Sequence, residues 1–82
     1  VLIHSQQGGA LVSIYAVEEG EYKIELCDLL GRNLLSQLQY VQPGRNNFSL
    51  HPNDLSSAIY IVKVYNKTSN TTKKIFIRST LE

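Results

Sequence analysis

Short segments in which apolar and polar residues alternate run through most of this chain, and this pattern constrains its fold most. A period of two is typical of β-strands that turn one face to a core and the other to water. The pattern is clearest at 22–27, where Ile24 and Leu26 alternate with Lys23 and Glu25. The same alternation predicts that Cys27 lies on the polar side of this strand.

Polar turn residues divide the chain into about seven such segments. We expect strands at 1–5, 11–17, 22–27, 33–41, 48–50, 58–66 and 71–79. The segment 33–41 also fits one turn of helical spacing, but its flanking turn residues and short length favour a strand. Several short strands with regular turn signals predict an all-β fold, an immunoglobulin-like antiparallel sandwich. The expected core comprises Tyr22, Ile24, Leu26, Tyr60, Val62, Val64, Ile75 and Ile77.

Length and composition exclude several classes of protein. A chain of 82 residues has room for one domain, which we place at 1–80, and we interpret Leu81 and Glu82 as a remnant of an expression vector. A hydrophobic content of 43% predicts a folded chain. The net charge of +1 is too small for the field of a nucleic-acid-binding protein. The apolar runs are shorter than the roughly 20 residues of a membrane helix, so we expect no membrane span.

Residue types that could support chemistry are present but scattered. Cys27, His51 and Asp54 have the types of a thiol triad, yet they lie on separate segments without a signature motif, so we predict no catalytic site. A single cysteine excludes an internal disulfide and a zinc finger. Acidic residues at 18–21 lack calcium-loop spacing, and we predict no metal or cofactor. Gly8 and Gly9 lack the helix and lysine of a phosphate-binding loop, and we expect a flexible segment there.

Two local features predict structural roles. In the turn 28–32, Asp28 can accept hydrogen bonds from backbone N–H groups two residues on, and Gly31 can adopt the left-handed conformation before Arg32. Tyr60 is similar to the tyrosine corner of sandwich domains. Its hydroxyl is expected to bond back to the preceding loop near Asp54 or Leu55.

The last two strands carry more apolar residues than a small core can cover. Ile59, Ile61, Tyr65 and Phe76 are expected to form an exposed patch, which another domain or a second copy of the chain would cover. Three basic residues, Lys63, Lys74 and Arg78, share the outward positions. Edge lysines commonly prevent strand addition. The functional alternative is a recognition surface made of Ile61, Lys63, Lys74, Phe76 and Arg78.

Four motifs follow one another between residues 22 and 78 of this pattern. They are 22–32, which ends in Asp28-Leu29-Leu30-Gly31-Arg32; 47–50, Asn-Phe-Ser-Leu; 55–64, which contains Tyr60; and 73–77, Lys-Lys-Ile-Phe-Ile. In this order they resemble the type A-like C-terminal sorting domain of type IX secretion system cargo proteins. Two departures are Ala58, where the family usually has glycine, and the absence of a Pro-Asn-Pro motif near the start.

The resemblance implies a non-catalytic signal that directs its parent protein through the periplasm and across the outer membrane, for surface attachment or release. The implied partners are translocon and shuttle proteins. A further implied partner is a sortase-like cysteine peptidase, which in many cargos removes the domain and joins the cargo to anionic lipopolysaccharide. The alternative is an immunoglobulin-like or fibronectin-like adhesion or spacer module. A sorting domain must end its precursor, whereas a spacer can lie anywhere.

Overall fold

Seven β-strands follow one another in the computed structural model, which describes residues 1–79. The strands are β1 (Leu2–Gln6), β2 (Gly9–Ala16), β3 (Gly20–Asp28), β4 (Asn33–Val41), β5 (Gly44–Leu50), β6 (Ala58–Tyr65) and β7 (Asn70–Ile77). The ambiguous segment 33–41 is a strand over its whole length. Our interpretation of Leu81 and Glu82 lies outside the described residues.

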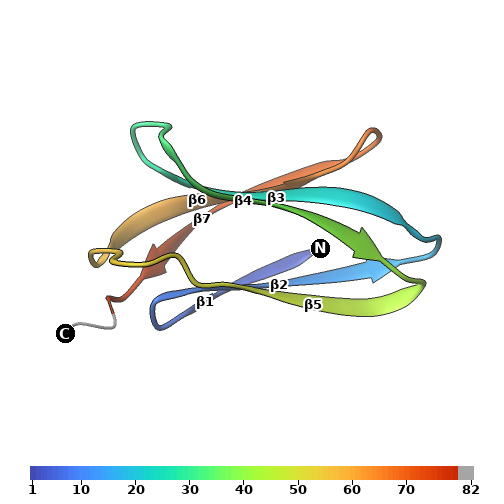
Figure 1. Cartoon of the computed structure of the whole chain (residues 1–82), viewed down its shortest axis with the longest axis horizontal. Coiled ribbons are helices and arrows are strands. Elements are labelled where there is room, and N and C mark those ends of the chain that lie inside the picture. Colours follow the sequence, from blue (N-terminus) through green and yellow to red (C-terminus); the bar gives the residue numbers. More distant parts are fainter. Residues whose placement is uncertain (80–82) are drawn as a thin grey trace.

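The strands form two antiparallel sheets that pack face to face (Figure 1). One sheet has the order β1-β2-β5 and the other the order β4-β3-β6-β7. This arrangement confirms the predicted all-β sandwich. The fourth strand lies beside the third because the turn at 28–32 makes β3 and β4 a hairpin.

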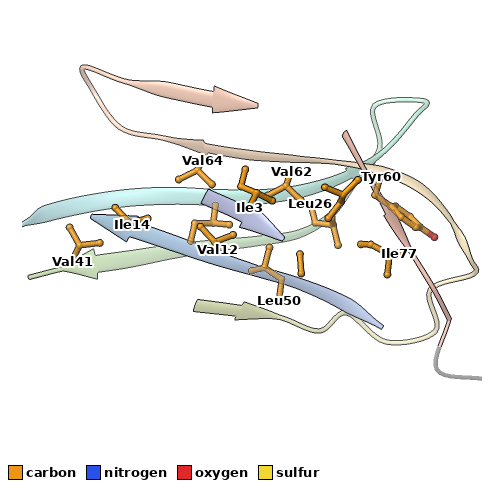
Figure 2. Close-up of a cluster of buried hydrophobic side chains, with 13 residues drawn as sticks. Ile3, Val12, Ile14, Leu26, Val41, Leu50, Tyr60, Val62, Val64 and Ile77 are labelled. Carbon is orange, nitrogen blue, oxygen red and sulfur yellow. The ribbon is translucent and has the colours of Figure 1, made fainter. Parts of the chain in front are cut away.

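The core lies between the sheets and takes apolar side chains from every strand (Figure 2). It consists of Ile3, Ala10, Val12, Ile14, Ile24, Leu26, Val41, Leu50, Tyr60, Val62, Val64, Ile75 and Ile77. Seven of the eight predicted core residues are in this set. Tyr22 is only partly buried against it, because it lies close to the beginning of β3, where fewer neighbours cover the ring.

The prediction for Cys27 was wrong in one respect, since its side chain is buried rather than exposed. It does lie on the outer face, opposite Ile61 of β6 and Asn33 of β4. β3 is an inner strand of its sheet, so neighbours on both sides cover a small side chain there. The β3–β4 register also shifts at this point and leaves Leu34 as an extra, bulged residue.

One side of the sandwich is closed by contacts between β1 and β7. The backbone N–H of Gly8 donates to the carbonyl of Arg78 at 2.7 Å, and Lys73 Nζ donates to the carbonyl of Ile3 at 3.0 Å. β1 and β7 are each an end strand of their sheet. The other end strands of the two sheets, β5 and β4, therefore lie on the opposite side of the sandwich.

Candidate recognition surface

The outer face of the β6–β7 hairpin carries four of the five residues that the sequence suggested for recognition, and the fifth, Arg78, directly follows β7. Across the hairpin, Ile61 is opposite Lys74 and Lys63 is opposite Thr72. Directly opposite residues point to the same face of a sheet, which is here the face away from the core. We call Ile61, Lys63, Lys74, Phe76 and Arg78 the basic hairpin face.

Exposure differs along this face. Phe76 is 54% exposed, and Ile59 on the opposite strand is 46% exposed. Ile61 is half-buried, as is Lys63, while Lys74 and Arg78 are exposed. An exposed aromatic ring and an exposed isoleucine lie side by side on one edge of this face, so part of the apolar patch is open to solvent.

The cations of this face have few local partners. Within residues 1–79, no salt bridge involves Lys63, Lys74 or Arg78. Glu25 lies opposite Lys63 in the sheet, but its carboxylate is 3.7 Å from Lys23 Nζ. The positive charge of the basic hairpin face is therefore available to an incoming anionic or dipolar group.

Lys73 has a different role from its neighbour Lys74. Its side chain lies on the core side of β7 and reaches the Ile3 carbonyl in the facing sheet. A shallow pocket of about 300 Å³ is lined by Phe76 and Arg78 together with residues 5–7. The end of the basic hairpin face thus continues into a hollow against the β1–β2 turn.

The β3–β4 turn is held rigid by Asp28. Its carboxylate accepts hydrogen bonds from the backbone N–H groups of Leu30 and Arg32, both at 2.9 Å, and from Arg32 Nε at 2.6 Å. Gly31 has a φ of +87°, in the left-handed region. Desolvation alone would raise the pKa of Asp28, but the Arg32 N–H and guanidinium and the Leu30 N–H hold that pKa below its ordinary value.

The β5–β6 loop is anchored by Tyr60, whose ring is buried. Its hydroxyl donates to the backbone carbonyl of Ser56 at 2.6 Å, next to the acceptors that the sequence suggested. Ala58 has a negative φ, whereas Asp54 in the same loop has a φ of +60°. The left-handed residue of this loop is thus Asp54, four positions before Ala58.

An open pocket lies between these two loops. It was not predicted from the sequence. It measures about 400 Å³ and is lined by the apolar side chains of Leu29, Leu30, Leu34 and Ile59, among others. Leu30 is 83% exposed. The sequence feature that could have indicated this pocket is the pair of adjacent leucines inside an Asp-x-x-Gly turn, where polar residues are usual.

The residue types considered for catalysis do not assemble into an accessible site. The Cys27 thiol is buried in the middle of a sheet, whereas His51 and Asp54 belong to the β5–β6 loop. Among residues 1–79, no group of three His, Cys, Asp or Glu side chains could hold a metal ion. No helix in this part of the chain is suited to crossing a membrane.

Comparisons with known proteins agree with the order of motifs. Residues 9–78 match the family described as the secretion system C-terminal sorting domain. The match begins at the start of β2, so it covers more of the chain than the motifs at 22–78. Neither the curated proteins nor the solved structures that were compared gave a match.

Proposed function

The chain belongs to the secretion system C-terminal sorting domains, and we propose that the type IX machinery reads it through the basic hairpin face. A domain of this family is a signal that directs its parent protein across the outer membrane, toward the cell surface or the medium. The observation that carries the proposal is that Ile61, Phe76, Lys63 and Lys74 share one outward face, followed directly by Arg78, and that these three cations form no salt bridge within residues 1–79.

The composition of the basic hairpin face suits recognition in two steps. Exposed charges steer a partner and set its orientation, and they act mainly on the rate of encounter. Apolar groups such as Phe76 then lose their water in the contact and hold the partner. The core residues of β6 and β7 are Tyr60, Val62, Val64, Ile75 and Ile77, and none of them belongs to the basic hairpin face, so we expect the fold not to require the cations of this face.

In this proposal the domain is a substrate of the machinery and performs no chemistry. Translocon and shuttle proteins bind it after the parent protein has reached the periplasm. A sortase-like cysteine peptidase supplies the catalytic thiol when the domain is removed. The burial of Cys27 supports this division, because a nucleophilic thiol needs access to its substrate.

The test is a secreted reporter fused ahead of this domain in a host with type IX machinery. Reversing two charges, with Lys74→Glu and Arg78→Glu, should lower the amount of surface or secreted reporter by about tenfold, the scale of electrostatic steering. The uncleaved reporter should accumulate in the periplasm. Truncation after Thr72 removes most of β7 and gives the level expected without a signal.

A matched control reverses two exposed cations elsewhere, with Arg45→Glu on β5 and Lys67→Glu in the β6–β7 loop. Its net charge change is the same, so export should stay at the level of the unaltered domain. Equal export by both charge-reversed variants would show that the basic hairpin face is not the surface that is read. If even the unaltered domain leaves the reporter inside the cell, an adhesion or spacer module becomes the better explanation.

A further inference from the structure

The free edge of β4 differs from the other three sheet edges of this domain. An unprotected edge strand presents unpaired N–H and C=O groups that can pair with another strand. β1 and β7 cover one another through the Gly8–Arg78 and Lys73–Ile3 hydrogen bonds. β5 contains Gly44 and Arg45, and the Asn46 side chain folds back onto the carbonyls of Gln42 and Gly44.

β4 carries none of these protective features. Its nine residues include no charged residue, glycine or proline. In the part of the chain that the structure describes, its only partner in the sheet is β3. Leu38 is 68% exposed and Tyr40 is 52% exposed on its outer face. Long, uncharged and partly apolar edges of this kind favour strand addition.

The regular part of β4, beyond the bulge at Leu34, is chemically palindromic. Residues 35–41 read Leu-Ser-Gln-Leu-Gln-Tyr-Val. An apolar residue stands at each end, a hydroxyl-bearing residue comes next, then a glutamine, and Leu38 is at the centre. A strand with this symmetry matches a second copy of itself when the two run antiparallel about a two-fold axis.

We propose that two copies of this domain pair antiparallel through their β4 edges, with Leu38 on the two-fold axis. In this register Leu38 faces the partner's Leu38 on the outer side, and Ser36 faces the partner's Tyr40. On the core side Leu35 faces the partner's Val41. The central and terminal contacts therefore pair apolar with apolar residues, the kind of cross-strand pair that stabilises a sheet.

The two inward glutamines also fit this register. Within one copy, Gln39 Nε2 donates to Gln37 Oε1 at 2.9 Å, which leaves each amide with further hydrogen-bonding groups. In the dimer Gln37 faces the partner's Gln39. The amide pair of one copy can therefore form further hydrogen bonds with the amide pair of the other. Neither amide needs to lose its existing bond.

Charge does not oppose the pairing. No charged residue lies on either β4, and on the outer face of β3 Lys23 is opposite Leu38, with Glu21 opposite Tyr40 and Glu25 opposite Ser36. In the joined sheet, Lys23 and the partner's Lys23 are three strand spacings apart, or about 14 Å. This separation exceeds the Debye length of about 8 Å at physiological ionic strength.

The expected dimer is weak. Stable protein interfaces bury about 1,600 Å² in total, and the pairing of one strand from each copy lies at the low end of interface sizes. The proposal therefore predicts self-association that depends on concentration. It does not rest on recognition by the secretion machinery, because solution measurements on the domain alone test it.

The first experiment is sedimentation of the 82-residue chain over a concentration series up to about 1 mM. The unaltered chain should shift from monomer to dimer. Leu38→Lys places two cations together on the two-fold axis and should raise the dissociation constant at least about tenfold. Val17→Lys makes the same chemical change at a residue that is 93% exposed in the β2–β3 turn, and it should leave the dimer unchanged.

The second experiment tests the register by oxidation. Leu38→Cys brings two thiols to facing positions and should give a disulfide-linked dimer. Ser36→Cys should not, because its two copies would be about 14 Å apart along the strands. The unaltered chain, with Cys27 buried, is the control for unrelated cross-linking.

Circular dichroism and thermal melting show whether each variant keeps the fold. A chain that remains monomeric at every concentration would overturn the proposal. So would a dimer that Leu38→Lys and Val17→Lys affect equally, or cross-linking that is as efficient at Ser36→Cys as at Leu38→Cys. Loss of dimer in Leu38→Lys with efficient oxidation of Leu38→Cys would support it.

Discussion

At the scale of single residues, two adjacent glycines in the β1–β2 turn have different structural roles. Gly8 has a φ of +78°, and its N–H donates to the Arg78 carbonyl. Gly9 is buried, and a Cβ atom added there would overlap the carbonyl oxygen of Leu50. From the sequence we expected a flexible segment here. The structure instead makes this turn a contact between β2, β5 and the end of β7.

Replacing Gly9 by alanine should therefore lower the free energy of unfolding by about 1–3 kcal/mol, as overpacking does when a backbone atom must move. The matched control is Gly20→Ala, because a Cβ atom at Gly20 meets no atom within 4 Å. That variant should stay within about 0.5 kcal/mol of the unaltered chain. Urea denaturation of the three proteins measures both effects, and equal stability of the two variants would contradict the assigned contact.

At the scale of elements, the β3–β4 turn depends on one carboxylate for its shape. Asp28 accepts three hydrogen bonds within the turn, two of them from backbone N–H groups. A rigid turn holds Leu29 and Leu30 outward beside the β5–β6 loop. The pKa of Asp28 lies below its ordinary value because these donors favour the ionised carboxylate over the effect of desolvation.

This lowered pKa predicts how stability depends on pH. An unfolded aspartate has a pKa of about 3.9. Because the folded value is lower, the stabilisation is complete above about pH 4 and is lost as the pH falls through the folded pKa. Asp28→Asn should be less stable at pH 7 and should lose less stability than the unaltered chain between about pH 5 and pH 2. Parallel stability curves in urea denaturation would contradict this role.

Element types and the inward faces could be predicted from alternation, because a residue on one side of a strand is either in the core or in water. β3, β6 and β7 follow this rule over most of their length. β4 does not, since its glutamines face inward and Leu38 faces outward. Alternation also does not show which side chains are buried by their neighbours on adjacent strands. Cys27 is buried by its neighbours on β4 and β6, which only the strand order brings beside it.

The candidate site was predictable in part for the same reason. Alternation predicted that Ile61, Lys63, Lys74, Phe76 and Arg78 lie on one side of their strands, and the β6–β7 register makes the first four neighbours. The pocket between the β3–β4 turn and the β5–β6 loop was not predictable. It depends on two loops, 28–32 and 51–57, that meet only at one end of the folded sandwich (Figure 1).

At the scale of the whole molecule, the sheet β4-β3-β6-β7 packs one face against the core and turns the other face, where we propose that recognition takes place, to solvent. The inner face carries Val62, Val64 and Ile75, which are buried against the other sheet (Figure 2). The outer face carries the basic hairpin face and, on β4, the exposed Leu38. A small domain of this kind is stable by only about 4–12 kcal/mol, so changes on the inner face have large effects.

The two faces should respond in opposite ways to substitution. Val62→Ala removes two methyl groups from a fully buried side chain and should lower the free energy of unfolding by about 1–3 kcal/mol, through lost burial and a cavity. Enough stability remains for most molecules to stay folded at 25 °C, so export of the fused reporter should continue. Lys74→Glu with Arg78→Glu should show the opposite pattern. Its stability should change by about 0.5 kcal/mol or less, because the charges are exposed, while export falls. Urea denaturation and reporter export, measured on the same variants, separate the two effects. If export follows stability across both variants, the machinery reads the folded state as a whole, and the basic hairpin face has no special part in it.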